Sequence, residues 1–378
     1  MNFELEDEAR QLAESVERFL RKDYDFAARR ALLNSSTGCS PAIWQTIAEL
    51  GLLSIALPEA HGGFGGGAVD LIGTMEGIGD ALVLEPYLQT VMCARLIAMA
   101  GGAEQQNSVL PAVGAGSMKL CFAQLERHSG HDAGRISTRA RRTDTGWVIS
   151  GEKRVVFGAP VADRIIVSAR VSGDDADRAG LALFMLDPGT PGIAQKQYRT
   201  LDGYCASDLT LHDVVVKDSA VIGVPGEAWA AIESVNDFAT ALVCAEAVGA
   251  MRYANEATLE YLKTRKQFGV PIGSFQGLRH PIVDMHIATE QCRSMAGLAC
   301  VNVDTATDMR ERSRIVSAAK IRISDACRQV SQEAIQLHGG IGMTDEMKVS
   351  HTFRRLTMIA QQFGDADHHL ARYAACDR

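Results

Sequence analysis

The sequence predicts an α+β protein in three parts: an N-terminal helical domain at 1–116, a middle β domain at 117–225 and a C-terminal helical bundle at 226–378. Three observations lead to this prediction. Apolar residues recur at helical spacing through the first third of the chain. After residue 118 they give way to short runs rich in β-branched residues. Helical spacing returns near Glu227 and continues through four long segments.

Composition and charge exclude several classes of protein. With 47% hydrophobic and 22% charged residues, the 378-residue chain is ordinary for a soluble globular protein. Its net charge of −8 does not favour a nucleic-acid-binding surface. The sequence contains no run of about 18 apolar residues, so it predicts no membrane span. The acidic N-terminus lacks the hydrophobic core of a signal peptide. We therefore expect a cytoplasmic protein.

Nine cysteines are spread along the chain, and none forms a Cys-x-x-Cys pair. Several lie within apolar helical patterns. This distribution predicts buried, reduced thiols rather than a disulfide framework or a zinc site. The nine are Cys39, Cys93, Cys121, Cys205, Cys244, Cys292, Cys300, Cys327 and Cys376.

The N-terminal domain is predicted to begin with a helix, because apolar residues between Leu5 and Phe19 share one face. Ser40 followed by Pro41 indicates the N-cap and first position of another helix. The glycine-rich stretch 58–67 lacks a preceding strand and the Gly-x-Gly-x-x-Gly spacing of a nucleotide-binding loop, so we interpret it as a tight loop. Further helices are predicted at 69–82, 87–101 and 104–114.

The middle domain is predicted from short β-rich runs that are separated by turn residues. Arg142–Trp147 reads as a hairpin turn between two of them. Several short strands of this kind are typical of a small β-barrel or sandwich. The runs are 119–124, 136–142, 146–150, 164–171, 180–186 and 207–216.

The C-terminal domain is predicted to contain four long helices. Such helices bury a shared core and leave enough apolar surface for a subunit interface. The segments are 227–263, 276–304, 308–338 and 344–361.

A glycine-rich break separates the last two of these helices. Gly339, Gly340 and Gly342 end the third helix, and Thr344 is placed like the N-cap of the fourth. Backbone N–H groups and a helix N-terminus that converge in this way suit a phosphate or pyrophosphate. An ordinary glycine-rich turn between helices is the alternative, since glycine patterns alone are weak signals.

A second motif lies between the first two long helices, and its spacing from the glycine-rich break is specific. Two shorter motifs occur earlier in the chain, at 58–63 and at 151–153 with Ala162-Asp163. The second motif is Arg265-x-x-Phe268-Gly269 followed by Gln276, and the break reads Gln336-x-x-Gly339-Gly340-x-Gly342.

These motifs, in a chain that is helical, then β-rich, then helical, resemble those of the acyl-CoA dehydrogenase superfamily. The resemblance covers almost the whole chain. It implies an N-terminal α domain, a middle β-barrel domain and a C-terminal four-helix bundle. It also implies FAD as cofactor, an acyl-CoA thioester as substrate, and an electron-transfer flavoprotein or similar acceptor as redox partner.

The resemblance assigns the FAD-binding residues. In such proteins FAD lies between the middle domain of one subunit and the C-terminal bundle of another. Arg265 would hold the pyrophosphate, because a guanidinium makes charge-assisted hydrogen bonds to phosphate. Phe268 and Gln276 would contact the adenosine half. The residues that would contact the same dinucleotide across the subunit interface are Gln336, Gly339 and Gly340.

The segments that hold the flavin ring in the family depart from its pattern here. The family usually has Thr-Glu-Pro and then Gly-Ser-Asp, whereas this chain has Leu125-Glu126-Arg127 and then Ser129-Gly130-His131-Asp132. The later aromatic-Ile-Thr/Ser-Asn segment reads Val155-Val156-Phe157-Gly158. The half of the site that holds a subunit's own flavin ring is therefore altered, and the half offered to a neighbour is intact.

The catalytic base also departs from the pattern. The reaction needs a carboxylate near the substrate α-proton, and the family positions for it hold Phe363 and Ala239, while Thr240 replaces an arginine used for CoA. Asp365 is our candidate base. A helix N-cap or an exposed turn residue is the alternative reading of Asp365. Asp367 and Glu246 are further candidates, and His368 with His369 point apart on a helix, so no metal site is expected.

The ending Phe363–His369 resembles the small-subunit type of pimeloyl-CoA dehydrogenase and the paired subunits of some bacterial acyl-CoA and sterol side-chain dehydrogenases. Three hypotheses follow. The chain is an FAD-dependent acyl-CoA dehydrogenase subunit of a homo- or hetero-oligomer, a dimer or tetramer. Alternatively, it is a same-fold oxidase or monooxygenase that uses Asp365, or a non-catalytic scaffold that completes the FAD site of a partner chain.

Overall fold

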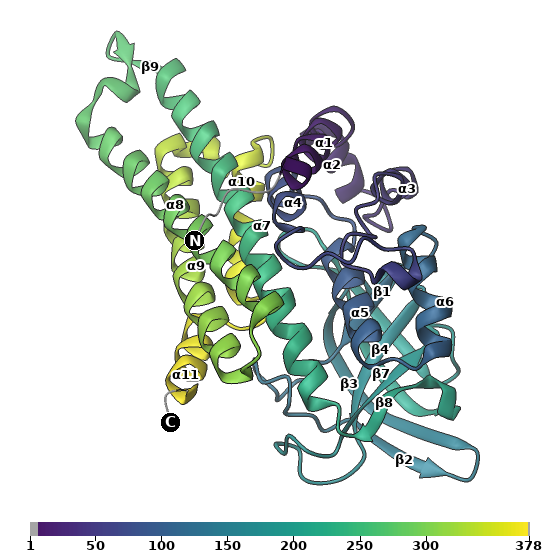
Figure 1. Ribbon diagram of the computed structural model, residues 1–378. Helices are drawn as coiled ribbons and strands as arrows, with labels where there is room; N and C mark the ends of the chain where they lie inside the picture. The colour runs from purple at the N-terminus through teal and green to yellow at the C-terminus, as the bar shows by residue number, and fades with distance from the viewer. Residues whose placement is uncertain (1–6, 377–378) are drawn as a thin grey trace. The chain divides into compact units, whose positions relative to one another are not determined.

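The computed structural model describes residues 7–376, with side chains from residue 10 onward (Figure 1). Residue contacts divide the chain into two compact units. The first comprises the described residues up to 30, residues 68–83 and the chain from residue 237 onward. The second comprises residues 31–67 and 84–236. None of the described helices combines the length and the apolar character that a membrane crossing requires.

The first unit is helical and contains the predicted C-terminal bundle. α9 packs against α8, α10 and α11, which follow one another from green to yellow in Figure 1. α7 begins in the second unit and runs into the first. The helices are α1 (Asp7–Asp23), α2 (Phe26–Leu33, which ends in the second unit), α4 (Ile72–Ala81), α7 (Trp229–Thr264), α8 (Gln276–Thr305), α9 (Met309–His338), α10 (Lys348–Gln361) and α11 (Ala366–Cys376).

Glycines set the crossing of α4 and α7. A Cβ at Gly79 would overlap the carbonyl oxygen of Glu246, and a Cβ at Gly249 would overlap that of Glu76. The two helix backbones therefore touch without intervening side chains. Such close contact brings the dispersion attraction of both backbones into play, and any larger residue at either glycine would push the helices apart.

The second unit is built on one sheet of eight strands. Along the pairing path the order is β6-β7-β3-β2-β4-β5-β8, and β1 pairs with β4. The pairs are antiparallel except β1 with β4 and β2 with β4. The strands are β1 (Leu120–Ala123), β2 (Arg139–Thr143), β3 (Gly146–Phe157), β4 (Arg164–Arg170), β5 (Leu181–Leu186), β6 (Ile193–Arg199), β7 (Cys205–Val216) and β8 (Val221–Gly226).

The sheet encloses an apolar core and carries helices at its side. Trp147 and Phe184 meet edge to face in this core, with ring centroids 5.6 Å apart. α5 packs against β1 and β8, and most of its side chains are buried. The three helices of this unit that complete the N-terminal part are α3 (Pro41–Glu49), α5 (Tyr87–Ala100) and α6 (Ala103–Gly114).

Two local predictions are confirmed. Ser40 caps α3, because its Oγ accepts a hydrogen bond from Ile43 N at 3.3 Å. The hairpin turn between β2 and β3 is present, with Thr143 paired to Gly146 across a two-residue loop.

Other elements were missed or misplaced. The sequence did not predict α2, β6, β8 or α11. α10 begins at Lys348 rather than at 344, and Thr344 is not its N-cap. Gly339–Met343 instead forms a 3₁₀ turn, and the Thr344 hydroxyl donates back to Ile341 O at 2.9 Å. The chain thus tightens after α9 before α10 starts, which a pattern of glycines does not reveal.

Candidate functional site

The chain between α7 and α8 forms a short hairpin that carries part of the predicted FAD site. β9 (Lys266–Gln267) pairs with β10 (Val270–Pro271), and Gln267 is opposite Val270. Phe268 and Gly269 therefore make a two-residue turn, with φ of 55° and 82°, as the tight turn of a twisted hairpin requires. The Phe268 side chain stands at the tip with 92% of its surface exposed.

Two polar side chains of this segment have no partner in the described chain. Arg265 and Gln276 are exposed, and neither makes a side-chain hydrogen bond or ion pair with another described residue. The backbone of Arg265 is fixed, since its carbonyl accepts from Ile272 N at 2.8 Å. The Phe268 ring meets the edge of Phe275, with centroids 6.1 Å apart. A cation, an aromatic ring and an amide are thus presented on a fixed backbone.

The glycine-rich turn after α9 leaves backbone accessible. Gly339 has φ 65° and ψ −149°, a conformation that is essentially restricted to glycine. A Cβ at Gly339 or Gly340 would meet nothing within 4 Å, whereas one at Gly342 would crowd His338. Packing within the chain therefore does not explain glycine at 340. Open space at this position fits a ligand or partner that approaches the backbone closely.

One aromatic contact brings the two motifs together. Tyr261, one turn before Arg265, stacks on His338, next to Gly339, with ring centroids 4.6 Å apart. A guanidinium, exposed amide side chains and an uncovered glycine backbone are the groups that a pyrophosphate-containing dinucleotide needs. The residues present thus fit FAD, and their individual roles remain a prediction.

In the first segment predicted to hold a flavin ring, backbone groups already make hydrogen bonds within the chain. Glu126 N donates to Ser129 Oγ at 3.0 Å, and Leu125 O accepts from Arg154 N at 2.8 Å. The Glu126 carboxylate is buried and pairs with Lys153 Nζ at 2.8 Å. Burial acts to raise the pKa of Glu126, but Lys153 and the hydrogen bonds from Ser137 and Thr138 hold it at about 2.

The second segment is a bulge at the end of β3. The pairing of β3 with β7 shifts register between Lys153 and Val156. Val155 adopts φ 51° and donates its N–H to Asp208 at 3.1 Å. Gly158 adopts φ 77° and donates its N–H to Cys205 O at 2.9 Å. The backbone donors of Val155 and Gly158 are therefore already used within the second unit.

The family position of the base holds Phe363, in a turn between α10 and α11 that is held by its surroundings. Phe363 has φ 60°. Lys320 Nζ, fully buried, donates to the carbonyls of Ile359 at 2.9 Å and Gly364 at 2.8 Å. His369 Nε2 donates to Phe363 O at 3.1 Å. The other family position, Ala239, is buried on α7 beside the buried Thr240.

Asp365 begins α11. Its Oδ1 accepts from the backbone N–H of His368 at 2.8 Å, the geometry of a helix N-cap. This contact was the alternative reading of Asp365, and it occupies one carboxylate oxygen. Asp367 lies exposed on the first turn of α11. The structure thus gives Asp365 a structural contact and leaves its catalytic role a prediction.

Glu246 is tied to an arginine far away in the sequence. Both of its oxygens accept from Arg355, at 2.6 and 2.8 Å, and both side chains are 2% exposed. A buried carboxylate whose two oxygens both pair with a guanidinium is screened from a substrate. This geometry argues against Glu246 as the base.

The two adjacent histidines differ in environment. His369 Nδ1 accepts from Ser317 Oγ at 3.2 Å while Nε2 donates to Phe363 O, so both nitrogens are engaged. Burial, chiefly, lowers the pKa of His369 to about 2. Within the described residues, no three His, Cys, Asp or Glu side chains are grouped as metal ligands.

Comparison with known families covers nearly the whole chain. The acyl-CoA dehydrogenase N-terminal domain matches residues 6–117, the middle domain matches 121–218 and the C-terminal domain matches 227–375.

Individual relatives agree with the family match. Acyl-CoA dehydrogenase FadE12 of Mycobacterium tuberculosis is 30% identical over 328 residues, which cover 84% of this chain and 83% of FadE12. A variant of the steroid ACAD Tcur3481-Tcur3483 is 30% identical with a TM-score of 0.87 over 98% of both chains. The FAD complex of PigA is 26% identical with a TM-score of 0.90 over 99% of this chain and 98% of PigA. The chain belongs to the acyl-CoA dehydrogenase family of FAD-dependent oxidoreductases.

Proposed function

We propose that this chain is one subunit of a hetero-oligomeric acyl-CoA dehydrogenase that desaturates an acyl-CoA thioester between its α and β carbons. The observation that carries the proposal is a contrast within one chain. The Arg265 side chain has no partner among the described residues, and a Cβ at Gly340 would meet nothing within 4 Å, whereas both family positions of the base lack a carboxylate. The two-chain name of Tcur3481-Tcur3483, a relative of this chain, supports a paired arrangement.

In this proposal the first unit supplies one side of the FAD site. Arg265 would neutralise the pyrophosphate, and the backbone of Gly339 and Gly340 would approach the dinucleotide. Phe268 would cover the adenosine half beside Gln276, and Gln336 would contribute an amide. Bound FAD supplies the hydride acceptor for the substrate β-carbon.

The α-proton needs a carboxylate, and there are two sources for it. Asp365, whose Oδ1 also caps α11, is the source within this chain. A partner chain with glutamate at the equivalent of Phe363 or Ala239 is the other. General-base assistance is worth about 10²–10⁴-fold, so a homo-oligomer without a base would be a poor catalyst.

Purification decides between these arrangements. The chain is to be purified alone and after co-expression with the products of neighbouring genes, and flavin is counted per chain. Turnover with an acyl-CoA only in the co-purified complex is the expected result. Rapid turnover by the chain alone would contradict the partner requirement. In that case Asp365→Asn is the next variant, and lost turnover with FAD still bound would identify Asp365 as the base.

A non-catalytic scaffold is the second candidate. The internal hydrogen bonds of Glu126 N and Gly158 N favour it, because these donors are already used. A complex whose flavin count and turnover are unchanged by Asp365→Asn, and abolished by loss of the partner's glutamate, would support this candidate.

The electron acceptor and the location complete the proposal. An electron-transfer flavoprotein or similar acceptor would reoxidise the complex. A cytoplasmic location is supported by the cysteines, all nine of which are free thiols.

A further inference from the structure

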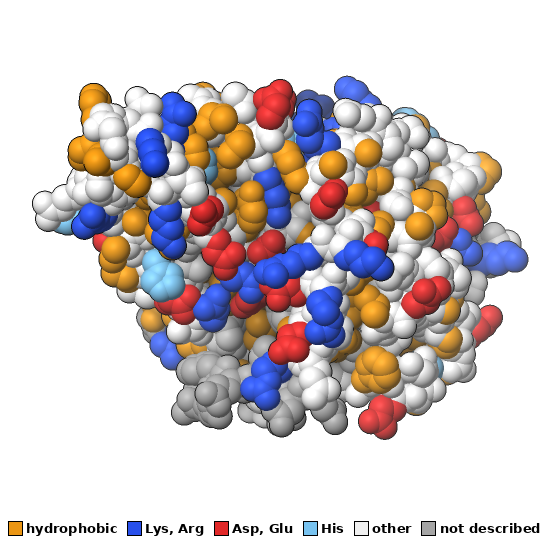
Figure 2. All heavy atoms as spheres, turned by 90° about the horizontal axis from the view of Figure 1, so that it is seen from above, with side chains coloured by type: hydrophobic (Ala, Val, Ile, Leu, Met, Phe, Trp, Pro, Cys, Tyr) orange, Lys and Arg blue, Asp and Glu red, His pale blue; other side chains and the backbone are white. Residues whose placement is uncertain are grey.

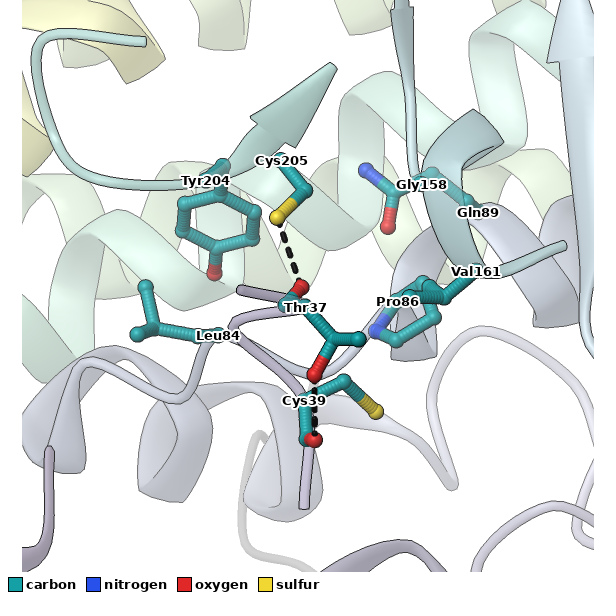
Figure 3. Close-up of a pocket in the computed structure, with 9 residues that line it drawn as sticks. All are labelled: Thr37, Cys39, Leu84, Pro86, Gln89, Gly158, Val161, Tyr204 and Cys205. Carbon is teal, nitrogen blue, oxygen red and sulfur yellow. Dashed lines mark hydrogen bonds between the residues drawn. The ribbon is translucent and has the colours of Figure 1, made fainter. Parts of the chain in front are cut away.

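A cavity in the second unit, shown in Figure 3, is too small for a substrate or cofactor. Its volume is about 10 Å³, which is room for about one water. Two of the polar groups beside it are already engaged, since the Cys205 thiol donates to Thr37 O at 2.7 Å and Thr37 Oγ1 donates to Cys39 O at 3.2 Å. The backbone at Gly340 in the first unit is open by comparison, because a Cβ there would meet nothing within 4 Å.

The two motifs of the predicted FAD site stand at the ends of different helices. Arg265 follows the last residue of α7, and Gly339 follows the last residue of α9. The separation of the guanidinium from the glycine backbone therefore depends on how these two helix ends are joined. At this place the Tyr261 ring stacks on the His338 ring, with centroids 4.6 Å apart and planes inclined by 24°.

Each ring is tied closely to its own motif. Arg265 N donates to Tyr261 O at 2.9 Å, which extends the hydrogen-bond pattern of α7 by one residue. Gly339 follows His338 directly, and its N–H donates back to carbonyls of α9. A Cβ at Gly342 would lie 2.8 Å from His338 Cβ, so the turn folds back over this residue. A shift of either ring therefore shifts the motif next to it.

His338 is held in one orientation. The residue is 3% exposed, and its Nδ1 donates to Ala334 O at 2.8 Å. Burial lowers the pKa of His338, so the ring is neutral at pH 7 and Nε2 is an acceptor. No described residue donates to Nε2, which is buried. Since an acceptor buried without a donor is unfavourable, hydrogen bonding accounts for one ring nitrogen alone, and Tyr261 uses the face of the ring.

Tyr261 lies at the edge of the core rather than within it. Its side chain is half-buried, whereas the neighbouring Leu262 and Leu337 are buried. The leucines therefore contribute more to the packing of α7 and α9 than the Tyr261 ring does. Loss of this ring should disturb the site more than the fold.

We propose that Tyr261 and His338 are positioning residues for FAD. Their stack holds the Arg265 guanidinium at the distance from the glycine backbone of 339–340 that a pyrophosphate-containing dinucleotide requires. In this role the rings act on FAD through the two motifs and without touching it. This role rests on the FAD-binding functions proposed above for Arg265 and Gly340.

A double-mutant cycle tests this role through FAD affinity, which needs no turnover. Fluorescence titration is carried out on the assembly in which the chain is purified, alone or with its partner. We expect Tyr261→Ala to weaken FAD binding by about fivefold or more, and Tyr261→Phe, which keeps the ring, to stay within about twofold of wild type. In the Arg265→Ala background, Tyr261→Ala should weaken binding by less than about twofold, because the group that the stack positions is absent.

Tyr253→Ala is the matched control. Tyr253 is also half-buried on α7, and Lys348 Nζ lies over its ring at 3.8 Å from the centroid. Loss of this ring should lower the free energy of unfolding of the apoprotein in urea and leave FAD affinity within about twofold of wild type. Equal losses of affinity in Tyr253→Ala and Tyr261→Ala would assign Tyr261 a general structural role and overturn the proposal.

The outcomes separate this role from the functions on which it rests. If Arg265→Ala weakens FAD binding and Tyr261→Ala does not, the positioning role alone fails. It also fails if the two losses multiply in the double variant, since the residues then act independently, or if Tyr261→Phe loses as much affinity as Tyr261→Ala. If wild type binds no FAD, or if Arg265→Ala binds it as tightly as wild type, the proposed FAD-binding role of Arg265 fails and the positioning role fails with it.

Discussion

Two turns in the first unit differ in whether their polar groups have hydrogen-bond partners. Around the hairpin tip at Phe268, the side chains of Arg265 and Gln276 have no partner among the described residues. At the turn that holds Phe363, the carbonyls of Ile359, Phe363 and Gly364 each accept a hydrogen bond from a buried side chain. Polar groups without partners indicate a site for a ligand or a second chain. Polar groups that all have partners within the chain indicate a turn whose shape is already fixed.

The surface around the hairpin agrees with this contrast. Figure 2 shows hydrophobic side chains at the left edge of the face, where Figure 1 places β9, and Lys and Arg interspersed with Asp and Glu elsewhere. Phe268, Val270 and Phe275 are all exposed. An aromatic tip beside a free cation suits contact with a dinucleotide and a partner chain better than contact with water.

The largest expected effect comes from a carboxylate placed on the rigid turn. His369 bonds the backbone carbonyl of Phe363 and not its side chain, so Phe363→Glu should leave the turn intact. With FAD in excess, turnover of an acyl-CoA should rise by about 10²–10⁴-fold, the usual contribution of a general base. Phe363→Gln is the control of equal size without a base. Equal turnover in the two variants, with one flavin bound per chain, would show that position 363 does not face the substrate.

The next largest effect is expected from removal of the Lys320 ammonium, which holds the turn at Phe363. Lys320→Met would leave the carbonyls of Ile359 and Gly364 buried without donors, and each such loss costs about 1–3 kcal/mol. We expect urea unfolding to show a loss of about 3–5 kcal/mol in the free energy of unfolding. Lys266→Met, on the exposed hairpin, should change it by less than about 0.5 kcal/mol. Similar losses in both variants would remove the contrast between the two turns.

How far the sequence predicts this fold depends on the length of each element. α8 and α9 were predicted to within one residue, because apolar spacing is sustained over 30 residues in each. β6 was missed because its side chains are half-buried or exposed, and its place is set by pairing with β7. α2 was missed because it makes about two turns, and buried Arg29, bonded to Leu82 O and His351, helps to hold it.

The candidate site shows the same limit. Arg265 and Gln336 were recognised by motif and spacing, which are local. The pairing of Glu246 with Arg355, 109 residues apart, has no sequence signal. Asp365 could be read in two ways, and only the hydrogen bond to His368 N shows the cap.

Removal of the unpartnered cation has a smaller expected effect. Arg265→Ala should weaken FAD binding by about 1.5–3 kcal/mol, or tenfold or more, through loss of a charge-assisted hydrogen bond. Fluorescence titration of the apoprotein with FAD gives the affinity. Lys263→Ala removes a neighbouring charge at the end of α7 and should have little effect. Equal FAD affinity in wild type and Arg265→Ala would mean that the exposed guanidinium is a solvated surface charge.

The smallest expected effect is a pH dependence of stability that arises at the turn that holds Phe363. Because the pKa of His369 is lowered to about 2 in the folded protein, the unfolded chain binds a proton first as pH falls below about 6.5. Stability contributed by neutral His369 is thus present above that pH and lost by about 1.4 kcal/mol for each unit below it. The difference between wild type and His369→Gln in urea unfolding, measured from pH 7 to pH 5, isolates this histidine from other titrating groups. Hydrogen exchange should accelerate at Gly364 and leave the 266–271 hairpin unchanged, whereas a uniform acceleration would show that the two turns do not differ in how they are held.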